Sequence, residues 1–347
     1  MFERVFVAMS GGVDSSVAAY LLKRAGYGVS GVHMELSTNL DPSREIDHTD
    51  LERTCQILDI PLFYMHLETE FQSLVVDYFC EEYSRGCTPN PCIRCNQNIK
   101  FGLLLERVKD LGGDLLATGH YARVVLEETG YKLLKGIDPK KDQSYFLYRL
   151  GQEELSQVIF PLGGKSKAEV KHLAAELRLP AVARKESQDI CFIPDSDSHA
   201  FIAARVKSQP GDIVDIEGQV MGQHQGLAHY TIGQRHGMSL SARERLYVIG
   251  IDVGTNRLII GSQQQLYKKK VVVYELVWVS GTAPKIALEI LAKVRYSSPA
   301  VKASLQIQDG KAEISFITPQ RAIAPGQSVV FYDGDNVLGG GIIGEAD

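Results

Sequence analysis

The chain has 347 residues, of which 44% are hydrophobic and 23% charged, a composition typical of a globular protein with two or three domains. This composition excludes a disordered chain, a collagen and a coiled coil as descriptions of the whole protein. No apolar run approaches the ~18 residues that span a bilayer. The net charge of −5 argues against a generally basic nucleic-acid coat, because residues 201–347 hold 15 Lys and Arg against 13 Asp and Glu and the first 200 hold 22 against 29. The N-terminus leaves no room for a signal peptide, so we expect a cytoplasmic protein.

Residues 4–118 are predicted to alternate strands with helices. Apolar runs of strand length recur, and between them apolar residues have helical spacing. This alternation predicts a doubly wound parallel α/β sheet of the Rossmann-like class, whose ligands bind at the carboxyl ends of the strands. We expect strands at 4–9, 27–33, 62–66 and 114–118, and helices at 15–25, 50–58 and 97–111.

A glycine-containing loop, Ser10-Gly11-Gly12-Val13-Asp14-Ser15-Ser16, joins the first strand to the first helix. The two glycines allow a tight turn, and the helix start beyond them presents free N–H groups to an anion. Serine hydroxyls can add donors, and Asp14 is suited to orient either Mg²⁺ or the loop. The pattern lacks the ending of a Walker A loop and the spacing of dinucleotide folds. It therefore predicts another kind of phosphate loop, the alternative being a capped helix after a glycine turn.

The six cysteines are placed unevenly, with five between residues 55 and 95 and one at 191. Without a signal peptide they do not suggest a disulfide framework, so the cluster indicates metal or sulfur chemistry, or inert core thiols. Cys55 and Cys80 fall in helix-like stretches, where we expect inert thiols, and Cys87 is left open.

Cys92 and Cys95 lie in a proline-braced loop before a helix, and Cys191 stands alone far along the chain. Near a helix start and beside Arg94, a thiol should have a lowered pKa. Sulfur insertion needs one thiol to carry a persulfide and another to release it, so two distant cysteines that meet in space would suffice. A Cys-x-x-Cys pair alone would also fit zinc or redox function.

Beyond residue 205 the sequence becomes rich in Gly, Val and Ile, and turn dipeptides separate short runs. This texture predicts one or two small β-barrels with a boundary near 270. Strands are expected at 271–279, 287–296, 303–308, 312–317 and 329–332.

The loop after the first strand resembles the PP-loop of ATP pyrophosphatases, which cleave ATP between the α- and β-phosphates and adenylate a substrate oxygen. Departing pyrophosphate must then be held by fixed donors rather than water. The resemblance implies that Met34 and Gly119 belong to an adenine pocket, although a core position is the alternative for Met34. It also implies ATP contacts at Ala8, Met9, Ser10, Gly11, Gly12, Val13, Asp14 and Ser15.

Further motifs occur in the order found in the bacterial tRNA-specific 2-thiouridylase family, and together they cover nearly the whole chain. They are Pro89–Asn96, Thr118–Arg123, Lys141–Tyr145, Ser187–Phe192 and Tyr230–Arg235. The resemblance implies a PP-loop domain at 1–204, a small central domain at 205–270 and a C-terminal β-barrel that contacts tRNA at 271–347.

The resemblance also implies roles for single residues. Cys95 matches the nucleophile and Cys191 the persulfide-bearing cysteine, and we expect adenylation to need Asp14. Asn90, Pro91 and Cys92 match the segment that meets the target base. Further matches to tRNA contacts are His120, Lys141, Asp142, Gln143, Arg295, Tyr296, Ser297 and Gln327. The alternatives are a histidine hydrogen-bonded within the protein for His120, a turn for 141–143, and a solvated barrel face for the last four residues.

The implied reaction uses ATP and Mg²⁺ to adenylate the C2 oxygen of a wobble uridine, followed by sulfur transfer from a cysteine persulfide. The expected partners are tRNAs with a wobble uridine (Lys, Glu and Gln acceptors) and a cysteine desulfurase or sulfur-relay protein, with no membrane and a monomeric chain. The alternatives are another PP-loop ligase that forms an amide, and a nucleotide sensor without turnover.

The chain departs from the family at Cys92, where many members have Asp. Three thiolates at 92, 95 and 191 would be enough to hold an iron–sulfur cluster, such as [4Fe-4S], with one iron left open. Cluster-dependent thiolation is therefore a further alternative. The segment 39–50 is also shorter than the family form, so we assign no tRNA contact there.

Overall fold

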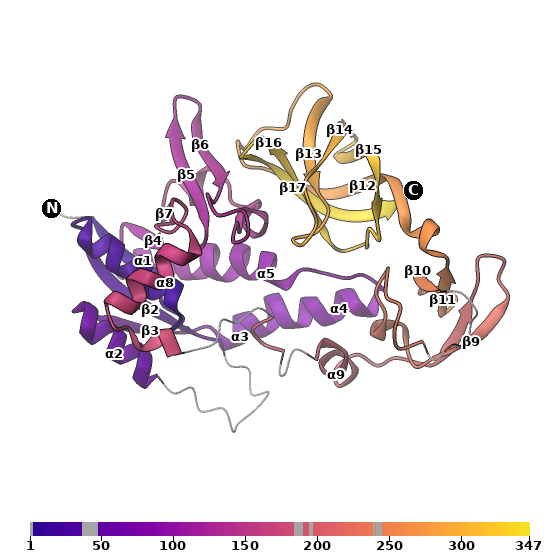
Figure 1. Ribbon diagram of the computed structural model, residues 1–347, viewed down its shortest axis with the longest axis horizontal. Helices are drawn as coiled ribbons and strands as arrows, with labels where there is room; N and C mark the ends of the chain where they lie inside the picture. Colours follow the sequence, from indigo (N-terminus) through magenta and orange to yellow (C-terminus); the bar gives the residue numbers. More distant parts are fainter. Residues whose placement is uncertain (1–2, 37–47, 184–189, 194–196, 239, 241–244) are drawn as a thin grey trace.

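The computed structural model describes residues 3–36, 48–183, 190–193, 197–238, 240 and 245–347. Most of the short segment 39–50 and residues 187–189 of the motif around Cys191 lie outside these ranges. Figure 1 shows an α/β domain beside a C-terminal barrel, with a small β-rich domain at the end of the molecule opposite the parallel sheet.

A five-stranded sheet in the order β3-β2-β1-β4-β7 forms the N-terminal domain, and every neighbouring pair is parallel. The prediction of a parallel α/β sheet is confirmed, and the carboxyl ends of the strands lie along one edge. The strands are β1 (Arg4–Ala8), β2 (Gly28–Glu35), β3 (Leu62–His66), β4 (Leu115–Ala117) and β7 (Val158–Ile159).

Helical segments cover both faces of this sheet, because alternate residues of a strand point to opposite faces. Val5 and Val7 of β1 pack with residues of α1 (Val13–Arg24), α2 (Thr49–Leu58) and α8 (Lys167–Glu176). Phe6 packs on the other face, with residues of η1 (Gln72–Asp77), η2 (Cys95–Leu104) and α6 (Leu105–Asp110). Further segments of this domain are α3 (Glu68–Phe71), η1 (Gln72–Asp77), α4 (Tyr78–Ser84), η3 (Ser144–Leu147), α7 (Gln152–Leu155) and η4 (Pro180–Ala183).

The helix expected at 97–111 is longer and of mixed type. It begins as α5 (Pro91–Arg94), continues as a π-helix, η2 (Cys95–Leu104), and ends as α6 (Leu105–Asp110). Asn90 caps it, since its side-chain oxygen accepts from the Cys92 N–H at 3.1 Å, and Pro91 takes the first helical position, which suits proline. Cys92 and Cys95 therefore lie within the helical segment, and the prediction of a loop before the helix was wrong.

A second sheet, in the order β10-β11-β8-β9, forms the small central domain. Its core contains buried apolar residues of β8, β10 and β11 and of the segment 227–238. Its elements are β8 (Gly211–Val214), β9 (Val220–His224), η6 (Leu227–His229), β10 (Tyr247–Asp252), β11 (Arg257–Gly261) and η7 (Gln263–Leu266). The helix before it, α9 (Ser198–Ala203), packs Phe201 against Phe79 and Phe192 of the first domain.

A closed six-stranded barrel ends the chain, as predicted, because β12 pairs with both β15 and β17. A hairpin of the N-terminal domain, which the sequence analysis did not identify, joins its edge through the pairing of β6 with β17 (Figure 1). The part of the chain that is described contains no helix both long and apolar enough to cross a bilayer. These strands are β5 (Ala122–Glu127), β6 (Gly130–Lys135), β12 (Tyr267–Trp278), β13 (Leu288–Lys293), β14 (Val301–Gln308), β15 (Lys311–Arg321), β16 (Ser328–Asp333) and β17 (Asn336–Ala346).

Candidate functional site

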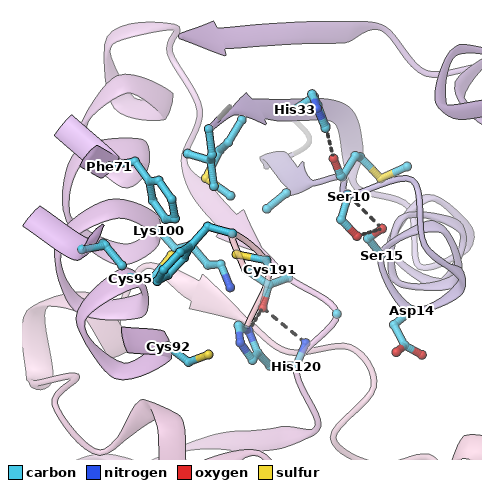
Figure 2. A pocket seen from close by; sticks show the side chains of 18 of the residues that line it. Ser10, Asp14, Ser15, His33, Phe71, Cys92, Cys95, Lys100, His120 and Cys191 are labelled. Carbon is cyan, nitrogen blue, oxygen red and sulfur yellow. Dashed lines mark hydrogen bonds between the residues drawn. The ribbon is translucent and has the colours of Figure 1, made fainter. Parts of the chain in front are cut away.

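A cavity of about 410 Å³ opens at the carboxyl edge of the parallel sheet. In Figure 2, Ser10 and Ser15 lie on one side of it, Cys92, Cys95 and Lys100 on the other, and Cys191 between them. The chain thus brings together residues that are more than 170 positions apart in sequence. The predicted site residues that line the cavity are Ala8, Met9, Ser10, Asp14, Ser15, Met34, Pro91, Cys92, Cys95, Gly119, His120, Gln143 and Cys191.

The phosphate-loop candidate is a tight turn held by its own hydroxyl groups. Gly11 has a φ of +73°, which favours glycine. Ser15 and Ser16 donate to the Gly12 carbonyl oxygen at 3.1 and 2.9 Å, and the Ser10 N–H donates to the Ser15 hydroxyl oxygen at 3.2 Å. Ser16 is fully buried, so it braces the turn, whereas Ser10 and Ser15 face the cavity.

Gly119 follows β4 and passes very close to this loop. A Cβ atom added there would lie 2.9 Å from both the Asp14 carbonyl carbon and the Ser15 backbone nitrogen. These neighbours are backbone atoms at the start of α1, so they cannot move without moving the loop. The close approach explains why a glycine stands here, whatever ligand the loop binds.

We therefore expect Gly119→Ala to weaken ATP binding by at least about tenfold, because the methyl group displaces backbone that faces the ligand. Isothermal titration with a non-hydrolysable ATP analogue would measure this. Gly164→Ala is the matched control, since a Cβ there has open space around it. Equal affinities of both variants for the analogue would contradict the assignment.

Asp14 is held by two side chains that the sequence analysis did not identify. Lys167 Nζ, at the start of α8, lies 2.7 and 2.8 Å from its two carboxylate oxygens, and the Tyr121 hydroxyl donates at 2.8 Å. The Lys167 side chain is 10% exposed and that of Asp14 36%, so the ion pair is shielded on the lysine side while the carboxylate still reaches the cavity. Both carboxylate oxygens thus already have partners within the protein, which favours a role of Asp14 in orienting the loop over binding Mg²⁺.

The predicted lowering of the thiol pKa values is wrong. Burial raises the pKa of Cys95 to about 12, and it also raises the pKa values of Cys92 and Cys191. The last two side chains reach the cavity, yet protein atoms surround them closely enough for desolvation to dominate. Arg94 does not offset this, because its guanidinium lies over the Tyr78 ring and bonds Glu275, on the barrel side of the helix.

Lys100 is the nearby cation that the sequence analysis missed. It lines the cavity, and its positive charge opposes part of the rise in pKa of all three thiols. It lies five residues after Cys95 within η2. A π-helix bonds residue i to residue i+5, so this turn brings Lys100 back over Cys95 (Figure 2).

His120 is a neutral histidine whose ring is hydrogen-bonded within the protein, which was the alternative to a tRNA contact. Its Nδ1 lies 2.6 Å from the Thr118 hydroxyl, and the rings of Phe101 and Phe160 pack against it. Burial lowers its pKa well below the usual value. Contact with tRNA at this position stays a prediction.

The segment 141–143 forms a turn beside the cavity. Asp142 is buried, and its carboxylate accepts from the N–H groups of Gly136 and Ser144 and from the Ser144 hydroxyl, all at 3.1 Å. Gln143 reaches the cavity and accepts from the Tyr121 N–H at 3.0 Å. The structure thus gives Asp142 a role in holding the turn, and the tRNA contacts predicted for 141–143 stay predictions.

Predicted tRNA contacts on the barrel lie where the barrel meets the α/β domain. The Tyr296 ring packs against Phe146 with centroids 4.4 Å apart and planes tilted by 37°, whereas Arg295 donates to the Arg321 carbonyl oxygen within the barrel. Gln327 Nε2 donates to the Thr88 carbonyl oxygen at 2.7 Å, next to the Asn90–Cys92 segment. Ser297 is exposed.

All six cysteines are free thiols. Among the described residues, the sulfurs of Cys92, Cys95 and Cys191 do not all lie within 4.8 Å of one another, so the three together form no ready site for a single metal ion. As three thiols lining one cavity they are nevertheless the donor set that an iron–sulfur cluster requires.

The fold and the cavity define a class: a PP-loop-type α/β domain with paired cysteines, joined to two β domains. Family models match residues 3–195 (tRNA methyl transferase HUP domain), 199–262 (tRNA methyl transferase PRC-barrel domain) and 268–343 (Aminomethyltransferase beta-barrel domain). The tRNA-specific 2-thiouridylase MnmA of Geotalea uraniireducens is 45% identical over 99% of this chain and 96% of its own length. MnmA 1 of Caldanaerobacter subterraneus is 46% identical over 98% of both chains. The chain belongs to the tRNA-specific 2-thiouridylase family.

One solved structure shares part of this fold at much lower identity. The U34-tRNA thiolase NcsA from Methanococcus maripaludis with its [4Fe-4S] cluster shares 22% identity over 54% of this chain and 60% of that chain, with a TM-score of 0.36. A likeness this slight does not bear on the choice of sulfur mechanism.

Proposed function

We propose that this chain is an ATP-dependent sulfurtransferase that converts a wobble uridine of tRNA into 2-thiouridine. One observation carries the proposal: a phosphate-loop candidate and the thiols of Cys95 and Cys191 line the same cavity. An activated base held there is within reach of both the nucleotide and the sulfur carriers. Full-length similarity to 2-thiouridylases supports the same reaction.

The first step activates the base. The uridine C2 oxygen attacks the α-phosphorus of ATP, the bond to the bridging oxygen breaks, and pyrophosphate leaves. The loop of Ser10–Ser15 binds the departing phosphates through backbone N–H groups and the start of α1. Lys167 and Tyr121 keep this loop in place through Asp14. Mg²⁺, bound with the nucleotide, would supply countercharge to the phosphates.

The second step transfers sulfur. The terminal sulfur of a persulfide on Cys191 attacks C2, and AMP leaves as the C2–O bond breaks. Cys95 then attacks the Cys191 sulfur, which forms a Cys95–Cys191 disulfide and leaves the transferred sulfur on the base. Alternatively, Cys95 attacks first and frees sulfide, which reacts with C2. Either order needs an external dithiol reductant to restore both thiols.

Methyl transfer is the competing function, because two of the matching family models carry that description. The cavity argues against it: two thiols beside a phosphate loop suit a reaction that cleaves ATP and moves sulfur. Incubation with ATP, Mg²⁺, a sulfur source and unmodified tRNA separates the two. We expect AMP and pyrophosphate to form only with tRNA present, and 2-thiouridine to appear in the nucleoside mass spectrum. A methylated nucleoside, or no nucleotide cleavage, would refute the proposal.

Cys92 separates the persulfide route from the cluster route. A cluster held by Cys92, Cys95 and Cys191 would supply an open iron that binds sulfide, and it would need all three thiolates. The persulfide route needs only two, so we expect Cys92→Ser to lose less than about fivefold in 2-thiouridine formed by iron-free enzyme. A loss as severe as that of Cys95→Ser would favour the cluster.

The partners follow from the reaction. We propose as substrates the tRNAs with a wobble uridine that the family resemblance implies, those for Lys, Glu and Gln. A cysteine desulfurase, directly or through a relay protein, would load Cys191. We further propose that the enzyme acts as a monomer in the cytoplasm, with domains at 1–204, 205–270 and 271–347.

A further inference from the structure

A single carboxylate of the barrel bonds two arginines of the α/β domain. Glu275 Oε2, on β12, accepts from Arg94 Nη2 and from Arg149 Nη2, each at 3.2 Å. Arg94 lies on α5 between Cys92 and Cys95. The contact therefore links the barrel directly to α5, which carries Cys92 and runs straight into η2 at Cys95.

The two guanidiniums are poorly solvated. The Arg149 side chain is 8% exposed and that of Arg94 20%, and the Nε atoms of both are buried without a hydrogen-bond partner among the described residues. Within the same part of the chain, Glu275 is the one carboxylate paired with either of them. The Glu275 side chain is itself 50% exposed, so water reaches one side of the contact. Without the carboxylate, two neighbouring positive charges would still lose their shared countercharge, and we expect the arginines to move.

The backbone at Glu275 is strained in a way that directs its side chain toward the two arginines. Its φ is +48°, the left-handed region that side chains other than glycine rarely adopt, although it lies inside a strand. The register of β12 with β17 breaks between Tyr274 and Val277, as in a bulge. Bulges and strained backbone often re-aim a side chain beside a functional site. Here the re-aimed side chain is the one that bonds Arg94 and Arg149.

A second barrel contact holds the other end of the same segment. The Thr88 N–H donates to the Pro325 carbonyl oxygen at 2.8 Å, and Gln327 Nε2 donates to the Thr88 carbonyl oxygen at 2.7 Å. The residues between Thr88 and Arg94 include the predicted base-contacting segment. The barrel therefore clamps this stretch at both ends, whereas the phosphate loop belongs to β1 and α1 and has no part in the clamp.

We propose that Glu275 is a positioning residue for sulfur transfer: through Arg94 it fixes the helix of Cys92 and Cys95, so that the barrel completes the thiol side of the cavity. This inference rests on the proposed function. The proposal predicts that adenylation and sulfur transfer can be separated by mutation, because Glu275 contacts the thiol side of the cavity and not the phosphate loop.

Two substitutions at this position test the proposal. Glu275→Gln removes the charge and keeps the size, whereas Glu275→Gly suits the left-handed backbone and removes the side chain. Single-turnover sulfur transfer from persulfide-loaded protein and tRNA-dependent AMP formation are measured separately. We expect both variants to lose 10- to 100-fold, to order of magnitude, in sulfur transfer, because a small misplacement of a reacting group is costly. AMP formation should stay within about twofold.

The matched control is Glu313→Gln, which breaks the exposed Lys270–Glu313 pair on the same barrel and should leave both rates unchanged. If the Glu275 variants do not fold, Arg94→Met tests the same contact from the other side and should show the same selective loss. Unchanged sulfur transfer, or a parallel loss of AMP formation, would overturn the proposal. If the proposed function itself is wrong, the result differs from all of these, because the wild-type protein would then form no 2-thiouridine.

Discussion

Cys191→Ser is expected to abolish 2-thiouridine formation while tRNA-dependent AMP release persists, and Cys95→Ser should do the same. Serine fills the same space but neither carries a persulfide nor attacks one. The phosphate loop lies across the cavity from Cys95, and neither cysteine belongs to it, so adenylation should survive. Nucleoside mass spectrometry and nucleotide chromatography on one reaction would report both steps. We expect thiolation to fall by at least about 10³-fold, as for other lost nucleophiles.

Cys80→Ser is the control for this pair, since Cys80 is a half-buried thiol on α4 outside the cavity. It should keep nearly full thiolation. Full activity in either Cys191→Ser or Cys95→Ser would refute the persulfide mechanism and the assignment of both cysteines.

Lys100→Met is expected to slow thiol chemistry and to move its pH profile upward. Burial already holds the thiol pKa values above their usual range, and the Lys100 charge works against that shift. Without the ammonium the pKa values rise further, so less thiolate is present at any given pH below them. The rising limb of the rate should therefore lie at higher pH. Each added pKa unit lowers the thiolate fraction about tenfold, and we expect iodoacetamide to alkylate Cys95 and Cys191 about tenfold more slowly near pH 8.

Two comparisons isolate the charge of Lys100. Lys100→Arg keeps a cation and should retain most of the reactivity. Lys109→Met removes an exposed lysine of α6, outside the cavity, and should have no effect. An unchanged alkylation profile in Lys100→Met would mean that this side chain does not influence the thiols.

The fold was largely predictable because the strands of the parallel sheet are short apolar runs. The strand expected at 62–66 coincides with β3, and the others differ from the structure by a few residues at their ends. The β5–β6 hairpin was not recognised. It is stabilised partly by the barrel, through the pairing of Leu134 with Asn336 at the start of β17. A contact between residues so far apart in sequence cannot be predicted from a local pattern.

The site was predictable where residues adjacent in sequence form it, as in the loop from Ser10 to Ser15. The partners of Asp14 and of the thiols were missed because tertiary contacts bring them in. Lys167 lies 153 residues from Asp14. Lys100 has the wrong spacing for the Cys95 face of an α-helix, and only the π-helical turn brings it over that thiol. The prediction that the thiol pKa values are lowered was wrong because sequence adjacency to Arg94 does not determine where the Arg94 side chain points.

Anaerobic single-turnover thiolation by iron-free protein preloaded with persulfide tests the central claim most directly. ATP, Mg²⁺ and unmodified tRNA would be supplied, and the nucleosides would be read by mass spectrometry. We predict about one 2-thiouridine per loaded persulfide, together with AMP, because Cys191 carries one transferable sulfur. Accumulation of AMP without 2-thiouridine would contradict the persulfide mechanism and favour a cluster held by the three cavity thiols.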